Sequence, residues 1–363
     1  MSGHEVLVVL GTRPEIVKLA PAIRAMADSN SLDPRVLHTG QHYDEELSSV
    51  FFDDLGVPRP DNHLRVGSGT QAQQTAAGLK GVERTIVERA PDAVVAVGDT
   101  NAVLSAALAT AKIDPPFVHV EAGIRSYDRS MPEEINRVVA DHVSDVAFAP
   151  TQTAFNQLHE ECVVADVHLV GNTIVDACLD HLSIARQKSS ILQDIGVNEG
   201  EYAVATVHRP RNTDDSGRLR KIARALDEQP MPVVFPTHPR TKAALEALNF
   251  KPTKSLRLTE PLGYLDFLRL LAESAVAVTD SGGVQEEASI LEIPCLTVRP
   301  NTERPETVSA GVNRLIEPGE LSESLCDLLT NPDLRESMKG SPDLYGDGTA
   351  GSQIALTLET ELD

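Results

Sequence analysis

The stretch from Ala275 to Glu292, AVAVTDSGGVQEEASILE, constrains the fold of this chain more than any other segment. A short apolar run leads into Asp280, Ser281, Gly282 and Gly283, and apolar residues then recur at helical spacing. We predict a buried strand, a tight turn and a helix that the Asp280 side chain can cap. The glycines leave backbone N–H groups uncovered at the positive end of the helix dipole, which favours an anion such as a phosphate.

Two carboxylates, Glu286 and Glu287, follow the glycines. Because a carboxylate repels phosphate, the one that faces the ligand is better suited to accept hydrogen bonds from sugar hydroxyls. We therefore interpret the segment as ribose recognition beside diphosphate recognition. A purely structural turn is the alternative, since strand–glycine–helix turns also occur in α/β proteins that bind nothing there.

Buried-type strands alternate with helical segments along the whole chain. The alternation predicts an α/β protein with two doubly wound, Rossmann-like sheets that face each other across a cleft, with the ligand between them. We place the first domain at residues 1–171, with a helix at about 352–363 packing back onto it, and the second domain at residues 172–351. Residues 50–75 are polar and turn-rich, and we expect their glutamines on the surface.

Composition restricts the partners of this protein. With 32 basic and 54 acidic residues the net charge is −22, so the general field of the protein disfavours nucleic acid and anionic membranes. We interpret the acidity as a solvated surface. The cysteines are widely spaced, which argues against a zinc site and a disulfide framework, at Cys162, Cys178, Cys295 and Cys326. No apolar run approaches the ~18 residues of a membrane span, so we expect a soluble, cytoplasmic protein.

Polar residues follow the predicted strands of the first domain. Thr12 and Glu15 are spaced as a capping box, which holds Arg13 at the carboxyl end of the first strand, where doubly wound sheets bind ligands. A structural arginine is the alternative. Lys18 lies further along the same helix, on a side that can turn toward the ligand.

Three further positions carry carboxylates. Asp99 ends the strand at 93–97 and is either a helix cap or a catalytic carboxylate. Glu121 leaves another buried strand, where a carboxylate is costly unless it is paired or used. Glu133 and Arg137 share one side of a helix that begins near residue 132, with simple helix-dipole chemistry as the alternative.

Three motifs, DSGGVQEE at 280–287, TERPE at 302–306 and GTRPEIVKLAP at 11–21, resemble those of the non-hydrolysing UDP-N-acetylglucosamine 2-epimerases. The resemblance covers nearly the whole chain and implies a glycosyltransferase-B architecture. It also implies reversible conversion of UDP-N-acetylglucosamine to UDP-N-acetylmannosamine, through elimination of UDP to 2-acetamidoglucal, by a homodimer that needs no metal or other cofactor. An epimerase of a related UDP-diacetamido sugar and a UDP-sugar transferase of the same architecture are the alternatives.

The resemblance implies roles for particular residues. Catalytic roles fall on Asp99, Glu121, Glu133, Arg137 and His208. Substrate-binding roles fall on Arg13, Lys18, Leu262, Phe267, Ser281, Gly282, Gly283, Glu287 and Arg304. Bacterial members carry a second, activating nucleotide-sugar site, and parts of it match Gln41, His42, Arg209 and His238. The loop SYDRSM at 126–131 and the absence of an Arg-Gln pair near residue 70 depart from those members, so a working and an altered activator site are both open.

Overall fold

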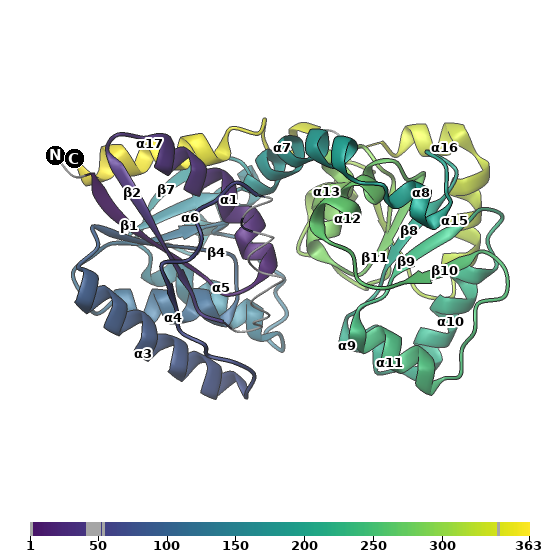
Figure 1. Ribbon diagram of the computed structural model, residues 1–363, viewed down its shortest axis with the longest axis horizontal. Coiled ribbons are helices and arrows are strands. Elements are labelled where there is room, and N and C mark those ends of the chain that lie inside the picture. The colour runs from purple at the N-terminus through teal and green to yellow at the C-terminus, as the bar shows by residue number, and fades with distance from the viewer. Residues whose placement is uncertain (1–2, 41–51, 53–54, 340–341) are drawn as a thin grey trace. The chain divides into compact units, whose positions relative to one another are not determined.

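The computed structural model describes residues 3–40, 52, 55–339 and 342–363, and the chain forms two compact units (Figure 1). Unit 1 comprises the chain up to Ala177 together with Tyr345–Asp363, and unit 2 comprises Cys178–Leu344. The sequence alone puts this division at residues 171 and 172.

Unit 1 is built on a parallel sheet whose order, among the described residues, is β3-β2-β1-β4-β5-β6-β7. The strands are β1 (His4–Leu10), β2 (Leu32–His38), β3 (Asn62–His63), β4 (Ala93–Val97), β5 (Phe117–Val120), β6 (Val146–Ala149) and β7 (Asp166–Leu169). The direction of winding reverses between β1 and β4, and the carboxyl ends beside such a reversal are where doubly wound sheets bind ligands.

Helices cover both faces of this sheet (Figure 1). They are α1 (Arg13–Asp28), α3 (Gln71–Arg89), α4 (Asn101–Thr110), α5 (Pro132–Val143), α6 (Gln152–Glu160), the first part of α7 (Thr173–Lys188) and α17 (Ala350–Leu362). Side chains of α3, α4 and α5 share one core with β1 and β4. The terminal helix α17 lies along α1, and a Cβ at Gly351 would come within 2.7 Å of Pro21, so a glycine is required at this contact.

Helix α3 is absent from the sequence-based prediction, which expects residues 50–75 to be polar and turn-rich. Its buried face contains Gly78 and Gly81 where most amphipathic helices carry large apolar side chains. Gln74 is also buried there, so the expectation that it lies on the surface is wrong. The glycines let α3 pack closely: a Cβ at Gly78 would lie 2.5 Å from the hydroxyl of Ser105.

Unit 2 repeats the arrangement, with the order β10-β9-β8-β11-β12-β13 among the described residues. Its strands are β8 (Ala203–Thr206), β9 (Val233–Pro236), β10 (Leu256–Thr259), β11 (Val276–Thr279), β12 (Cys295–Thr297) and β13 (Asn313–Leu315). Its helices are α8 (Ile191–Ile195), α9 (Pro210–Thr213), α10 (Ser216–Asp227), α11 (Pro239–Ala247), α12 (Tyr264–Ala272), α13 (Gly282–Ile290), α14 (Pro305–Ser309), α15 (Leu321–Thr330) and α16 (Pro332–Ser337). Winding reverses between β8 and β11.

Residues 173–195 form two helices, α7 and α8, rather than one. The break lies at Ser189, whose hydroxyl donates to Asp266 at 2.5 Å, and Ser190, whose hydroxyl donates to Asp194 at 2.8 Å. The Ser189 hydroxyl also accepts from the Ile191 backbone at 3.3 Å. Local serine bonds of this kind, at Ser189 and Ser190, compete with a continuous helix, which explains the interruption.

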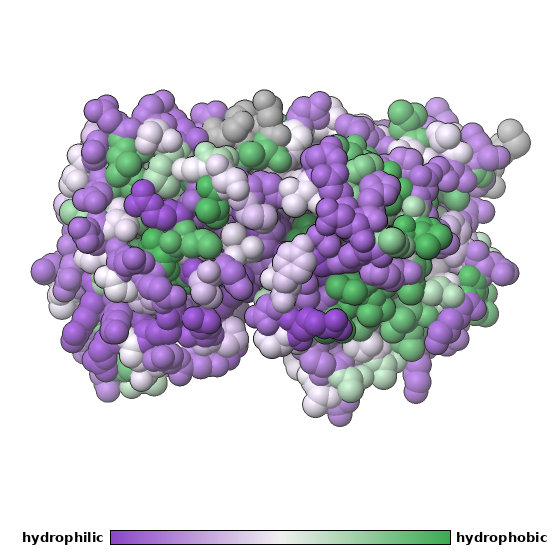
Figure 2. All heavy atoms as spheres, turned by 180° about the vertical axis from the view of Figure 1, so that it is seen from behind, coloured by the Kyte–Doolittle hydropathy of each residue, from purple (hydrophilic) through white to green (hydrophobic). Residues whose placement is uncertain are grey.

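The visible surface is largely hydrophilic. Hydrophilic side chains cover much of the face in Figure 2, with separate apolar areas between them. Throughout the described parts of the chain, each helix is too short or too polar to cross a bilayer.

Candidate active site

The loop after β1 is tied to the loop after β4 by one buried carboxylate. Thr12 and Glu15 form the predicted capping box. The Glu15 carboxylate accepts hydrogen bonds from the backbone of Gly11 at 2.9 Å and of Thr12 at 2.7 Å, and from the Thr100 hydroxyl at 2.6 Å. Burial raises the pKa of Glu15, and these hydrogen bonds oppose the rise. Arg13, the exposed first residue of α1, is thereby fixed at the carboxyl edge of the sheet.

Glu121 is paired at the end of β5. The Lys18 Nζ on α1 lies 2.6 Å from both carboxylate oxygens, and the two side chains are 16% and 5% exposed. The backbone of Glu121 has φ +66°, a left-handed conformation that costs a residue with a Cβ of the order of 1 kcal/mol or more. The packing around β5 therefore holds this carboxylate in a strained position at the sheet edge.

Asp99 is not a helix cap. Thr100 caps α4 instead, with its hydroxyl accepting from the backbone of Ala102 at 3.1 Å. The Asp99 carboxylate pairs with the Arg137 guanidinium, and its backbone carbonyl accepts from the Asn136 amide at 2.9 Å. Helix α5 thus holds Asp99 from two directions.

Glu134, which sequence reasoning missed, is the buried carboxylate at the start of α5. It accepts from the backbone N–H groups of Ser126 and Tyr127, both at 2.9 Å, and from Arg137 at 2.8 Å. Glu133 is exposed, and no hydrogen bond or ion pair to it occurs among the described residues. Arg137, which shares a side of α5 with Glu133, pairs with Glu134 and Asp99.

In unit 2, Asp280 does not cap α13, so that prediction is wrong. Ser281 occupies the cap position, and the fully buried Asp280 faces the loop after the neighbouring strand β8. It accepts from the backbone N–H groups of His208 and Arg209, both at 3.0 Å, and from the Asn212 amide at 3.0 Å. Adjacent parallel strands bring these loops together, and the Asp280 carboxylate then fixes the His208 backbone.

The start of α13 is open. A Cβ at Gly282 or Gly283 would meet no atom within 4 Å, and no side chain of the described residues caps this helix. The backbone N–H groups and the positive end of the dipole are thus accessible, as an anion site requires.

His208 lies beside this helix start. Its Nδ1 is 3.2 Å from the Asp280 carboxylate, and its ring centroid is 5.9 Å from that of His238. Burial lowers the pKa of His208, with Asp280 opposing the change and His238, Arg209 and Arg240 adding to it. The lowered pKa favours the neutral form of the imidazole.

Arg304 reaches the same region from the loop after β12. Its Nε donates to Glu286 at 2.5 Å, and Glu286 is fully buried, whereas Glu287 retains slight exposure. Glu303 accepts from Arg299 at 2.6 and 2.9 Å. Burial alone would raise the pKa of Glu303, but Arg299, Arg209 and Arg304 lower it to about 2.

The remaining predicted residues fall into two groups. Leu262, just before α12, and Phe267, within it, are partly buried against the core around Tyr202 and Leu270. Of the suggested activator residues, Arg209 and His238 lie at the ends of β8 and β9, while Gln41 and His42 lie outside the described residues.

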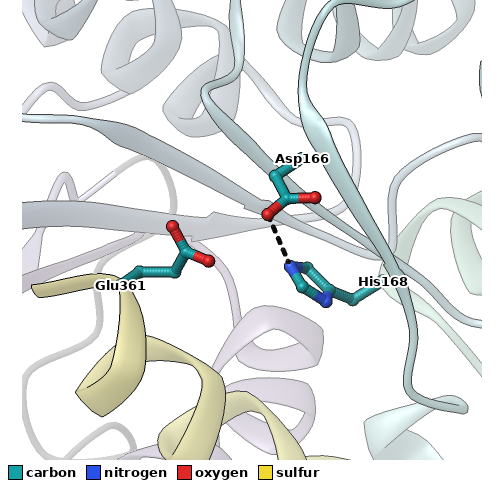
Figure 3. A group of neighbouring side chains, drawn as sticks. All are labelled: Asp166, His168 and Glu361. Atoms are coloured by element: carbon teal, nitrogen blue, oxygen red, sulfur yellow. Dashed lines mark ion pairs between the residues drawn. The ribbon is translucent and has the colours of Figure 1, made fainter.

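Asp166, His168 and Glu361 form a separate group of possible metal ligands (Figure 3). Their donor atoms lie within 4.8 Å of one another, and His168 Nε2 is 3.4 Å from the Asp166 carboxylate. Both carboxylates are exposed, and the group belongs to β7 and the terminal helix α17, so it shares no residue with the sites described above.

The chain is similar to known proteins along nearly its whole length. A family model for UDP-N-acetylglucosamine 2-epimerase matches residues 24–359. A UDP-N-acetylglucosamine 2-epimerase of Methanocaldococcus jannaschii is 42% identical over 362 residues, which cover 97% of this chain and 98% of the relative. The crystal structure of the Methanocaldococcus jannaschii UDP-GlcNAc 2-epimerase, in complex with UDP-GlcNAc and UDP, superimposes with a TM-score of 0.88 at 41% identity, covering 98% of this chain and 99% of that chain.

Two further proteins resemble this chain, one in sequence and one in fold alone. The UDP-2,3-diacetamido-2,3-dideoxy-D-glucuronate 2-epimerase of Pseudomonas aeruginosa is 37% identical over 357 residues, covering 97% of this chain and 98% of the relative. Phytolacca americana UGT2, complexed with UDP-2-fluoro-glucose and pterostilbene, has a TM-score of 0.67 over 99% of both chains at 11% identity, which is a likeness of fold alone. With the two parallel sheets, it confirms the predicted two-domain, Rossmann-like architecture of the glycosyltransferase-B type. On the match across nearly its whole length, the chain belongs to the UDP-N-acetylglucosamine 2-epimerase family of enzymes.

Proposed function

We propose that this enzyme interconverts UDP-N-acetylglucosamine and UDP-N-acetylmannosamine by eliminating UDP and adding it back. One observation carries the proposal. Val97 and Val120 are register partners at the ends of β4 and β5, so Asp99 and Glu121 leave adjacent strands at one edge of the sheet. Each carboxylate is held by a cation from a different helix, Arg137 on α5 and Lys18 on α1.

The chemistry needs both carboxylates because the C2 hydrogen of the sugar is not acidic. A base removes the C2 proton while the C1–O bond to the diphosphate breaks, so that UDP leaves with the electron pair and a C1–C2 double bond forms. An acid then returns a proton to the opposite face of C2, and a UDP oxygen attacks C1. Asp99, Glu121 and Glu133 supply the base and the acid, as positioned carboxylates can.

The groups proposed to hold the leaving diphosphate come from unit 2, with Arg13 of unit 1 as a further member. The open start of α13 offers backbone N–H groups, and Arg304 and Arg13 provide positive charge. His208, whose Nδ1 lies 3.2 Å from the Asp280 carboxylate beside the helix start, contacts the departing diphosphate. Glu287, at the buried side of α13, binds the ribose hydroxyls.

UDP-N-acetylglucosamine is the proposed substrate because the matching family and the Methanocaldococcus jannaschii relative are both UDP-N-acetylglucosamine 2-epimerases by name. To test this, the purified enzyme is incubated with each of a panel of UDP-sugars, including a diacetamido sugar, and the products are identified by NMR. Conversion of UDP-N-acetylglucosamine without an acceptor supports the proposal. Conversion of the diacetamido sugar alone would reassign the substrate, and turnover that requires an acceptor would point to a transferase.

We also propose an activator site, working or altered, that uses Arg209 and His238 together with Gln41 and His42, which lie outside the described residues. A working site makes velocity rise sigmoidally with UDP-N-acetylglucosamine and makes the reverse reaction depend on a trace of it. Hyperbolic kinetics in both directions would reject the site for this protein.

The resemblance further supports a cytoplasmic homodimer. Sedimentation velocity tests the assembly, since a single species at the mass of one chain over micromolar concentrations would reject it.

A further inference from the structure

A buried histidine and aspartate join the loops that carry Asp99 and Glu121. His119, in the middle of β5, and Asp141, on α5, are both fully buried. The His119 Nδ1 is 2.6 Å from the Asp141 Oδ1, and its Nε2 is 2.8 Å from the carbonyl oxygen of Gly98. The proposed mechanism uses neither residue.

The hydrogen-bond partners of His119 and Asp141 show which of their side-chain atoms carry hydrogens. A carbonyl oxygen can only accept, so the His119 Nε2 carries a hydrogen and donates to Gly98. The other Asp141 oxygen accepts from the Gly123 backbone at 3.1 Å and pairs with the Arg125 guanidinium at 2.6 Å. Asp141 is therefore an ionised carboxylate, and Nδ1 donates to it as well. His119 thus donates one hydrogen bond from each ring nitrogen, to the Gly98 carbonyl and to the Asp141 carboxylate.

Each contact ends next to a proposed catalytic carboxylate. Gly98 directly precedes Asp99 and has φ +81°, and Gly123 follows two residues after Glu121 and also has φ +81°. A Cβ at Gly123 would lie 2.2 Å from the Ala154 carbonyl oxygen, so this turn has no freedom to accept another residue. The pair therefore sets where both loops leave the sheet.

We propose that His119 is a positioning residue for the epimerisation. Its hydrogen bond to the Gly98 carbonyl holds the Asp99 carboxylate at a fixed position relative to Glu121. The inference rests on the proposed function, because it assumes that these two carboxylates act on one sugar. A displacement of reacting groups by about 1 Å can lower turnover by about 10²-fold.

Two substitutions separate the contacts of His119. The amide nitrogen of Asn stands where Nδ1 stands along the side chain, and that of Gln stands where Nε2 stands. His119→Gln keeps a donor for Gly98, and His119→Asn keeps only the donor for Asp141. Val118→Ala, in the same strand but on its opposite face, is the control for general damage to the fully packed β5.

The measurements are kcat and KM for UDP-N-acetylglucosamine, with kcat expressed per UDP-binding site from calorimetry so that unfolded protein does not count. His119→Asn should lower kcat by about 10²-fold, His119→Gln by less than about 10-fold and Val118→Ala by less than about 2-fold, with KM similar throughout. Equal losses in the two histidine variants, no loss in either, or a comparable loss in Val118→Ala would overturn the inference.

Hydrogen exchange distinguishes a failure of this inference from a failure of the proposed function. If the wild-type enzyme converts no UDP-sugar, the function is wrong, but exchange over residues 97–101 still reports on positioning. Faster exchange in His119→Asn alone supports the contact. Unchanged exchange in that variant would overturn it.

Discussion

The ammonium group of Lys18 lies 2.6 Å from both carboxylate oxygens of Glu121 and so ties α1 to the end of β5. The two residues are 103 positions apart in the sequence, and both side chains are largely buried. Glu121 also has a left-handed backbone, so the pair holds a strained carboxylate at the proposed site.

Lys18→Met should therefore damage both stability and turnover. Removing one partner of a buried ion pair leaves a buried charge, which costs about 3 kcal/mol of unfolding free energy, and kcat should fall by about 10²-fold. Denaturant unfolding and steady-state kinetics measure the two effects. Lys80→Met on the exposed surface of α3 is the control and should change neither. Wild-type turnover in Lys18→Met would remove the pair from the mechanism.

The neighbouring carboxylates Glu133 and Glu134 should respond differently to substitution by glutamine. Glu133→Gln should lower turnover by about 10²-fold while the unfolding free energy changes by less than about 0.5 kcal/mol, because Glu133 is exposed. Glu134→Gln should destabilise the protein by about 1–3 kcal/mol, because Glu134 holds Ser126, Tyr127 and Arg137. Full activity in Glu133→Gln would exclude it as acid or base.

The contrast between Glu133 and Glu134 shows that the sequence alone does not tell which of two adjacent carboxylates is buried. Neighbouring residues on a helix point about 100° apart, so the inward carboxylate depends on how the helix is rotated by its packing. Asp280 was misassigned for a similar reason: its partners belong to the loop after β8, more than seventy residues earlier. The strands themselves follow from apolar runs, as parallel sheets buried on both faces require.

Some elements lack the periodic apolar pattern that sequence reasoning relies on. The buried face of α3 contains glycines, and β3 contains only Asn62 and His63 at an edge of the sheet. His119 did give a signal, as a polar residue in the apolar strand FVHV, but the sequence does not contain the information that Gly98 and Asp141 are its partners.

Gly283→Ala should weaken the binding of UDP while leaving the fold intact. A Cβ at this position meets no atom within 4 Å, so the fold should tolerate it. The methyl group would occupy the space above the open helix start, and UDP affinity should fall by at least about 10-fold, equivalent to about 1.4 kcal/mol. Calorimetry and thermal unfolding measure both quantities. Unchanged UDP affinity would place the diphosphate elsewhere.

The ion pairs of Glu303 should make stability depend on pH in the acid range. Its pKa is about 2 in the folded protein, below the ordinary glutamate value of 4.5, so its contribution is present above pH 4.5 and is lost as the pH falls toward 2. Glu303→Gln should therefore be less stable than wild type by about 3 kcal/mol at pH 7, with the difference shrinking below pH 4.5. Glu83→Gln, exposed on α3, is the control. A difference that stays constant from pH 7 to pH 2 would contradict the assignment.

Elimination through a glycal makes the most direct prediction about this enzyme. In deuterated water, with UDP-N-acetylglucosamine and no added cofactor, the product UDP-N-acetylmannosamine should carry deuterium at C2, because the proton returned to C2 comes from an exchangeable group. Free UDP and 2-acetamidoglucal should accumulate slowly, and Glu121→Gln should suppress product and exchange together by about 10²-fold or more. Epimerised product that retains hydrogen at C2 would contradict elimination and place the bond-breaking step at another carbon.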